Sequence, residues 1–158
     1  MKFSILILTI GIPGSGKSTW VEQYRQNYPR SIVISTDVIR KELTGMIKCD
    51  PNQNSLMHEE ARRRVKAILD DPRYYTGDYP LGPTIVVDST NCDPAEWIAY
   101  KRLGASIYIA KIFPVPPEEA MKRQLARERV VPMDVLQAKW DSYIRNKDKI
   151  PKLFNMVL

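Results

Sequence analysis

The sequence has few cysteines, and this scarcity excludes several classes of protein. Only Cys49 and Cys92 occur among its 158 residues. Two thiols build neither a disulfide framework nor a zinc cluster of cysteine ligands. The cysteine content is therefore typical of a reducing compartment, and we expect the protein in the cytoplasm.

Long hydrophobic runs are also missing. The apolar stretch at the start, Met1 to Ile10, contains Lys2 and is too short to cross a membrane. It leads directly into a glycine-rich segment rather than into the small residues of a cleavage site, so it does not resemble a secretion signal. We interpret it as a buried strand and expect no membrane association.

Neither internal repeats nor low-complexity segments interrupt the chain, and its length suits one domain spanning residues 1–158. Hydrophobic residues make up 44% and charged residues 27%, which is typical of a globular protein and excludes a disordered one. The net charge of +6 has two open interpretations. It either serves solubility alone or attracts a polyanionic partner such as nucleic acid.

Short apolar runs alternate with segments of helical pattern. We predict strands over Phe3–Thr9, Ser31–Ser35, Thr84–Asp88 and Ser106–Phe113. Helices are predicted over Gly16–Asn27, Asp37–Leu43, Ser55–Leu69, Asp93–Gly104, Pro117–Glu128 and Asp134–Asn146, and a loop over Asp70–Pro83. This alternation indicates an α/β fold with a mostly parallel sheet.

One predicted helix carries a basic cluster, Arg62, Arg63, Arg64 and Lys66. The cluster favours a nucleic-acid partner. The alternative is a solvated helix face, which is the usual role of a charge run.

The most specific motif is Gly11-Ile12-Pro13-Gly14-Ser15-Gly16-Lys17-Ser18, which fits the phosphate-binding pattern G-x-x-x-x-G-K-[ST]. Glycines allow backbone N–H groups to surround phosphate oxygens, and the following helix presents an N-terminus that favours anions. Lys17 would contact the β- and γ-phosphates, and Ser18 would bind Mg²⁺. A predicted strand before the motif and a helix after it argue against a chance match. The motif predicts ATP and Mg²⁺ binding but does not identify the acceptor.

Asp37 and Arg40 follow the second predicted strand and lie three residues apart, so they share one helical face. In an open α/β sheet, ligands bind at the carboxyl ends of the strands. Asp37 could accept the proton of an attacking hydroxyl there, and Arg40 could hold an acceptor phosphate. Equally open is a structural role, in which Asp37 caps the helix and Arg40 pairs with Glu42 or faces solvent.

The third predicted strand ends in Asp88 and is followed by Thr90 and Asn91. An acid in this position can hold Mg²⁺ or its water shell. A turn with only local hydrogen bonds is the alternative, since Asp, Ser, Thr and Asn are common turn residues. The phosphate-binding motif makes the site interpretation the favoured one.

Basic residues gather again near the end of the helix predicted from Pro117. Lys122, Arg123, Arg127 and Arg129 lie on or beside it, and the spacing predicts that Arg123 and Arg127 face the same way. Arginines on a mobile lid can neutralise the charge that develops during phosphoryl transfer. By itself the run fits a solvated face better, paired with Glu118, Glu119 and Glu128.

Taken in order, these motifs resemble the phage-type polynucleotide 5′-hydroxyl kinases. The matching stretches are Ile5 to Trp20, Asp37-Val38-Ile39-Arg40, Asp88-Ser89-Thr90-Asn91 with Pro94, Val115-Pro116, Arg123 to Arg127, and Val131-Pro132-Met133-Asp134-Val135-Leu136. The phosphate-binding motif is shared by many kinases, whereas the combination is much more specific. The resemblance implies an adenylate-kinase-like P-loop fold, with a sheet of about four to five strands and an arginine-bearing lid.

The resemblance also implies roles for individual residues. ATP and its metal would be bound by Gly11, Pro13, Gly14, Ser15, Gly16, Lys17, Ser18, Thr19 and Arg123. Asp37 would be the general base, and Lys17 and Arg127 would act on the transferred phosphate. Substrate would be contacted by Asp37, Arg40, Asp88 and Asn91. Ser18 and Asp88 would hold the metal.

Two departures from the family pattern concern the acceptor. Gln124 stands where many relatives carry asparagine, and Pro114 stands where an acid is common. The leading hypothesis is a kinase acting on the 5′-hydroxyl of a DNA or RNA end, without an obligatory protein partner. A kinase of small-molecule hydroxyls is the first alternative. The second is a non-catalytic nucleotide-binding module. The presence of all the expected site residues argues against it, namely Lys17, Ser18, Asp37, Asp88 and Arg127.

Overall fold

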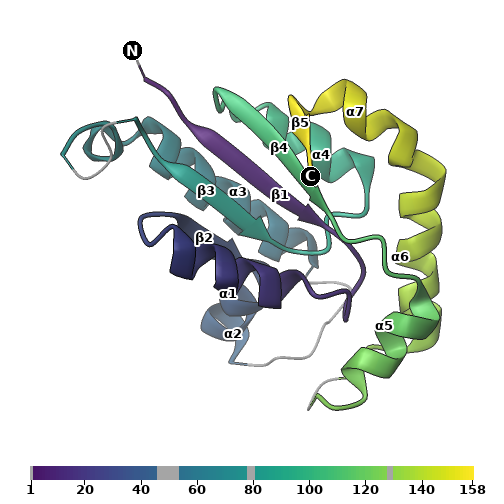
Figure 1. Cartoon of the computed structure of the whole chain (residues 1–158). Helices are drawn as coiled ribbons and strands as arrows, with labels where there is room; N and C mark the ends of the chain where they lie inside the picture. Colours follow the sequence, from purple (N-terminus) through teal and green to yellow (C-terminus); the bar gives the residue numbers. More distant parts are fainter. Residues whose placement is uncertain (1, 46–53, 78–80, 128–129) are drawn as a thin grey trace.

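A parallel β-sheet forms the centre of the structure, a computed structural model that describes residues 2–45, 54–77, 81–127 and 130–158 (Figure 1). Within these residues the sheet has five strands in the order β2-β3-β1-β4-β5, all parallel. The strands are β1 (Ile5–Ile10), β2 (Ile32–Ser35), β3 (Thr84–Asp88), β4 (Ile107–Ile112) and β5 (Met156–Val157).

Helices follow the strands along the chain. They are α1 (Lys17–Asn27), α2 (Thr36–Thr44), α3 (Asn54–Asp70), α4 (Pro94–Lys101), α5 (Pro117–Gln124), α6 (Met133–Asn146) and α7 (Ile150–Leu153), with short 3₁₀ helices at Pro72–Tyr75 and Lys147–Lys149. The predicted α/β fold with a parallel sheet is confirmed.

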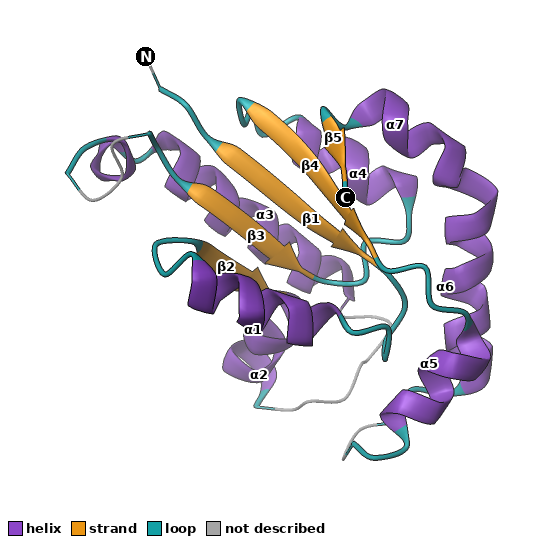
Figure 2. Cartoon of the chain, viewed as in Figure 1, coloured by secondary structure: helices purple, strands orange, loops and turns teal. Residues whose placement is uncertain are grey.

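Helices cover the sheet on both faces (Figure 2). Alternate residues of β1 point to opposite sides, so Leu6 and Leu8 contact the side of α3 and α4, while Ile7 packs on the side of α1. Trp97 of α4 lies fully buried in the larger cluster. The continuous apolar run in β1 is thus explained by burial on both faces.

The carboxyl ends of three strands meet at one edge of the sheet. The end of β1 leads into the phosphate-binding motif and α1, and Ser35 at the end of β2 lies in register with Asp88 at the end of β3. This register places the start of α2 beside the loop after β3, as expected for a ligand site in an open parallel sheet.

Several predicted boundaries need correction. The helix predicted over Pro117–Glu128 ends at Gln124, and Glu128 itself lies outside the described residues. The helix predicted to reach Gly104 ends at Lys101. Strand β5 has no counterpart in the prediction, because two residues are too few to show a pattern.

The start of α4 lies where the sequence predicts a helix start. The Asp93 side chain caps this helix by accepting a hydrogen bond from the Ala95 N–H. Glu96, in the first turn of α4, accepts a hydrogen bond from Arg62 of α3, so a contact between two helices also holds this end of α4.

Candidate active site

The phosphate-binding motif forms the turn between β1 and α1. Gly14 and Gly16 have φ of 83° and 98°, in the left-handed region that favours glycine. The Gly11 N–H donates to the Thr90 carbonyl at 3.0 Å, which ties the turn to the loop after β3. The predicted strand, turn and helix around this motif are confirmed.

Lys17 is buried at the first position of α1. Its Nζ donates to the Ile12 carbonyl at 2.9 Å, within the turn itself. Burial lowers the pKa of Lys17 from 10.5 to about 8, and the nearby carboxylates of Asp88 and Asp37 oppose that fall. The ammonium group is therefore held in a poorly solvated position, where contact with phosphate oxygens would restore the missing stabilisation.

Ser18 and Asp88 come together from different elements. The Ser18 hydroxyl donates to Asp88 Oδ2 at 3.2 Å, and burial raises the pKa of the Asp88 carboxyl. Mg²⁺ in nucleotide sites takes one or two protein oxygens together with phosphates and water. This hydroxyl–carboxylate pair fits that demand. The described residues contain no cluster of three or more His, Cys, Asp or Glu for a metal held by protein alone.

The turn also contains a polar atom without a partner. Ser15 Oγ is buried and makes no hydrogen bond. A Cβ built on Gly11 would lie 2.6 Å from this oxygen, so only glycine leaves the space there. A buried hydroxyl facing a glycine-lined turn fits a site that gains its partners when phosphate binds.

Gly14→Ala should weaken both ATP binding and stability. A Cβ at Gly14 would lie 2.5 Å from the Ala120 carbonyl oxygen, a backbone atom within α5 that cannot easily move. We expect ATP affinity to fall by about tenfold or more, since the displaced turn no longer fits the phosphates. Calorimetric titration with ATP and thermal unfolding measure the two effects.

Gly104→Ala is the matched control for Gly14→Ala. Gly104 has φ of 86°, but a Cβ there meets nothing within 4 Å. This variant should show only the backbone strain, about 1 kcal/mol, with unchanged ATP affinity. Equal losses of ATP affinity in the two variants would contradict the role of the Gly11–Ser18 turn in binding phosphate.

Asp37 and Arg40 form an ion pair on α2. The cap of this helix is Ser35, whose side chain accepts from the Val38 N–H at 3.3 Å, so the alternative in which Asp37 caps the helix is wrong. Arg40 is buried, whereas the Asp37 side chain is 67% exposed. A buried cation thus orients a carboxylate that remains open to the solvent side.

Arg40 retains donor capacity beyond this pair. Its Nη2 donates to Asn54 Oδ1 at 3.3 Å, and its Nε is buried without a partner. Glu42, the alternative partner considered from the sequence, accepts from Arg64 instead. An unsatisfied buried guanidinium donor beside an exposed carboxylate is suited to an anionic ligand.

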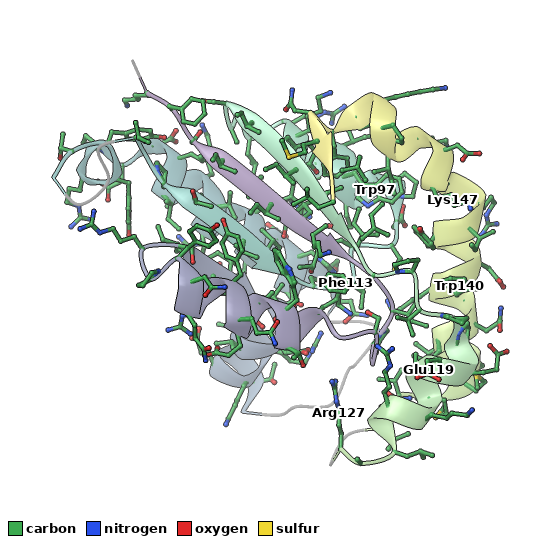
Figure 3. All side chains as sticks on the ribbon, in the orientation of Figure 1. Trp97, Phe113, Glu119, Arg127, Trp140 and Lys147 are labelled. Atoms are coloured by element: carbon green, nitrogen blue, oxygen red, sulfur yellow. The ribbon has the colours of Figure 1, made fainter. Side chains whose placement is uncertain are left out.

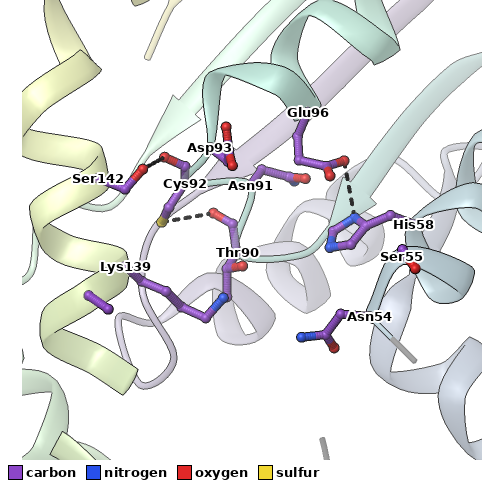
Figure 4. A pocket seen from close by; sticks show the side chains of 11 residues that line it. Asn54, Ser55, His58, Thr90, Asn91, Cys92, Asp93, Glu96, Lys139 and Ser142 are labelled. Carbon is purple, nitrogen blue, oxygen red and sulfur yellow. Dashed lines mark hydrogen bonds and ion pairs between the residues drawn. The ribbon is translucent and has the colours of Figure 1, made fainter. Parts of the chain in front are cut away.

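Asn91 is held firmly in the loop after β3. It lies in the left-handed region with φ of 45°, its Nδ2 donates to the Thr9 carbonyl at 2.9 Å, and its own carbonyl accepts from Trp97 Nε1 at 2.6 Å. Its Oδ1 is buried without a partner. The residue lines a pocket of about 390 Å³ that opens beside this loop (Figure 4).

The predicted arginine lid is only partly assembled. Arg123 Nη1 donates to the Ser15 carbonyl at 3.3 Å, so Arg123 reaches the phosphate-binding turn. The prediction that Arg127 shares its helical face is wrong, because α5 ends at Gln124 and Arg127 lies in the following bend. Arg127 is exposed at the far end of α5 (Figure 3). Arg129 lies outside the described residues.

Gln124 is the last residue of that helix. Its Nε2 donates to the Val131 carbonyl at 2.7 Å, and its Oε1 accepts from the Val131 N–H at 3.1 Å. The side chain is buried, so this double contact is sheltered from water. The residue that departs from the family pattern therefore joins the two ends of the segment from Arg123 to Val131, which we call the lid segment.

The basic cluster on α3 is neutralised by neighbouring carboxylates. The pairs are Arg62–Glu96 (3.2 Å), Arg63–Glu60 (2.6 Å), Arg64–Glu42 (2.7 Å) and Lys66–Asp70 (2.8 Å). Paired charges of this kind attract phosphates less than free ones. This pairing favours the solvated-face alternative for α3 over a nucleic-acid surface.

Sequence reasoning missed two residues of the pocket beside Asn91. His58 of α3 and Lys139 of α6 lie on its walls together with Asn54 and Glu96 (Figure 4). No motif contains His58 or Lys139, since they come from helices far apart in the chain. Only the packing of α3 and α6 around the loop after β3 brings them together.

Comparisons with known proteins agree with this geometry. The family model described as AAA domain (AAA_33) matches residues 6–150. A chain of the Pnkp1/Rnl/Hen1 RNA repair complex is similar in structure, with 18% identity, a TM-score of 0.72, and coverage of 94% of this chain and 47% of that one. The protein thus spans about half the length of that relative. The resemblance drawn from the sequence is confirmed at the level of a P-loop kinase domain.

Two small-molecule kinases share the fold. A gluconokinase from Sinorhizobium meliloti 1021 is 14% identical, with a TM-score of 0.61 and coverage of 99% of this chain and 82% of that one. A deoxyadenosine kinase from M. mycoides is 14% identical, with a TM-score of 0.56 and coverage of 98% of this chain and 90% of that one.

No described helix is long and apolar enough to span a membrane. The family match covers most of the chain: this protein belongs to the AAA domain family and has the fold of a P-loop kinase.

Proposed function

We propose that the protein is an ATP-dependent kinase that transfers the γ-phosphoryl group to the 5′-hydroxyl of a DNA or RNA end. The observation that carries this proposal is the exposed Asp37 carboxylate held by buried Arg40, at the same sheet edge as Ser18 and Asp88. A proton acceptor, a phosphate-binding cation and a metal site are thereby gathered in one place.

Each residue has a defined task in this reaction. Bound ATP·Mg²⁺ supplies the phosphoryl group and neutralises part of its charge. Lys17 and the glycine turn would hold the β- and γ-phosphates, and Ser18 and Asp88 would hold the metal. Asp37 takes the proton of the 5′-hydroxyl while that oxygen bonds to the γ-phosphorus and the bond to the bridging oxygen breaks. Arg127 comes from the lid segment to the transferred group.

The structural relatives support a nucleic-acid acceptor. The similar chain from the Pnkp1/Rnl/Hen1 complex is described as part of an RNA repair complex, and the match covers 94% of the present chain. Arg40, with its unpartnered Nε, supplies a donor for the phosphate on the 3′ side of the terminal nucleoside. We propose activity in the cytoplasm and without an obligatory protein partner.

A small-molecule acceptor is the competing function. It is favoured by the pocket of about 390 Å³ and by the ion pairs that neutralise the basic cluster on α3. The gluconokinase and deoxyadenosine kinase of similar fold act on small molecules by name. A panel of 5′-hydroxyl oligonucleotides, nucleosides, 3′-nucleotides and sugars with labelled ATP decides between the two.

Arg40→Ala should erase a preference for acceptors that carry a 3′-phosphate. Wild-type enzyme should use a nucleoside 3′-monophosphate more efficiently than the bare nucleoside, by about tenfold or more, because a charge-assisted contact contributes about 1.5–3 kcal/mol. The variant should treat the two acceptors alike and bind ATP normally. Steady-state kinetics with both acceptors give the two ratios.

Lys41→Ala is the control, because Lys41 is the exposed neighbour of Arg40 on the same helix. Arg40→Lys tests the buried position with a charge retained and guards against misfolding of the alanine variant. Wild-type enzyme that phosphorylates a plain nucleoside or sugar as well as an oligonucleotide would overturn the polynucleotide assignment.

A further inference from the structure

The pocket of about 390 Å³ opens between α3, α6 and the loop after β3 (Figure 4). It adjoins the candidate active site on two sides. Asn54 on its wall accepts a hydrogen bond from Arg40, and Thr90 on its wall accepts one from the Gly11 N–H of the phosphate-binding turn. A group lying in this pocket would therefore be next to both the base and the phosphate-binding turn.

One wall presents a fixed hydrogen-bond acceptor. Asn91 is 1% exposed, and its Oδ1 has no partner. The orientation of the amide is settled by its neighbours, because Nδ2 faces two carbonyl oxygens, those of Thr9 at 2.9 Å and Ser89 at 3.4 Å. Oδ1 must therefore be the atom left over, and a buried acceptor without a partner is costly unless a ligand supplies a donor.

His58 presents a second acceptor. Burial lowers the pKa of His58 to about 4, with further lowering by the cations Arg62, Lys139 and Arg40, so the imidazole is neutral at neutral pH. Its Nδ1 lies 3.3 Å from Glu96 Oε2 but makes no hydrogen bond there. A neutral imidazole has one N–H donor and one acceptor nitrogen. We place the proton on Nδ1, the nitrogen beside the carboxylate, so that Nε2 serves as the acceptor. Figure 4 shows this second nitrogen on the side of Thr90 and Asn91.

A cation completes the pocket. Lys139 extends from α6 toward Thr90, on the side away from His58 (Figure 4). The wall thus offers two acceptors at one end and an ammonium donor at the other. A ligand that matches this pattern carries an amino group with two protons and, separately, an electronegative atom.

We propose that this pocket binds the 5′-terminal base of the acceptor and selects bases that carry an exocyclic amino group. The amino group donates to Asn91 Oδ1 and His58 Nε2, and Lys139 faces a ring nitrogen or carbonyl oxygen of the base. Adenine, cytosine and guanine have such a group, whereas thymine and uracil do not. The inference rests on the proposed function for the identity of the acceptor, and it makes His58 a specificity-determining residue.

The test removes one amino group and nothing else. Adenosine 3′-monophosphate and purine riboside 3′-monophosphate differ only in that group, and calorimetry measures their dissociation constants without requiring turnover. Wild-type protein should bind the adenosine compound about fivefold to thirtyfold more tightly, since one or two hydrogen bonds are at stake. Kinase assays with oligonucleotides that begin with adenine or purine should show the same ratio in kcat/KM.

His58 variants connect the preference to this residue. His58→Phe keeps a ring of similar size but has no acceptor, so the preference should fall to the smaller contribution of Asn91 while ATP affinity stays unchanged. His58→Gln can donate to Glu96 and still offer an oxygen to the pocket, so it should keep the preference. Glu59→Gln, an exposed neighbour on α3, is the control for helix stability.

The two readouts separate the two proposals. Equal binding of the two monophosphates by wild-type protein, or an undiminished preference in His58→Phe, would overturn the base pocket. Clear binding preference with transfer only to small molecules would keep the pocket and overturn the polynucleotide function. Transfer to oligonucleotides without any base preference would keep the polynucleotide function and overturn the base pocket.

Discussion

Lys17→Ala should abolish phosphoryl transfer while the protein remains folded. In the proposed reaction the Lys17 ammonium, which donates to the Ile12 carbonyl within the turn, would contact the β- and γ-phosphates, where charge develops during transfer. Its loss should raise the barrier by several kcal/mol, on the order of 10² to 10³ in kcat. Single-turnover assays with labelled ATP measure the effect, and a folded variant that keeps more than about a tenth of wild-type turnover would contradict the mechanism.

Removing the buried ammonium of Lys17 while keeping its aliphatic stem should make the folded protein more stable at neutral pH. Because burial lowers the pKa of Lys17 to about 8, the folded protein disfavours the ammonium by roughly 3 kcal/mol at neutral pH. Wild-type stability should rise as pH increases from about 8 to about 10.5, as the lysine loses its proton. Lys17→Met keeps the aliphatic stem and should be the more stable protein below that range, with the difference vanishing above it. Urea unfolding at several pH values measures this.

Asp37→Asn should lower kcat far more than it weakens ATP binding. The amide keeps the shape and can still accept from Arg40, but it cannot take the proton of the attacking hydroxyl. A general base typically contributes about 10² to 10⁴-fold. Turnover at saturating ATP and acceptor, together with an ATP titration, separates the chemical step from binding.

The control for this substitution is Asp141→Asn, which removes an exposed carboxylate of α6 away from the pocket. It should behave as wild-type protein in both assays. Near-normal turnover of Asp37→Asn across the pH range would show that Asp37 merely holds Arg40 in place.

The parts of the site that lie close together in sequence were predictable. The turn from Gly11 to Ser18 needs only local glycines and a following helix, and Asp37 and Arg40 need only the spacing of one helical turn. The apolar run before Asp88 marks a buried strand, and parallel strands bring their carboxyl ends to one edge. These facts follow from local geometry, and they gave the correct fold.

What failed to emerge from the sequence depends on contacts between distant segments. His58 and Lys139 meet only because α3 and α6 pack around the loop after β3. The ion pair of Glu96 with Arg62 joins α4 to α3, and strand β5 is recognisable only from its pairing with Ile109 and Ala110. The spacing of apolar residues along the sequence predicts neither of these contacts between distant segments.

The Gln124–Val131 contact has an entropic consequence for the lid segment. The Gln124 carboxamide binds both the N–H and the carbonyl of Val131 and thereby joins two points of the chain. The conformational entropy lost by joining them is lost when the protein folds, not when a ligand binds. Arg127 lies on chain whose two ends are already joined. To reach a phosphate it must order its own rotamers, at up to about 2 kcal/mol, with less backbone freedom left to lose. If Arg127 acts on the transferred phosphate as proposed, the Gln124–Val131 contact leaves less of the neighbouring chain to be ordered when the nucleotide binds.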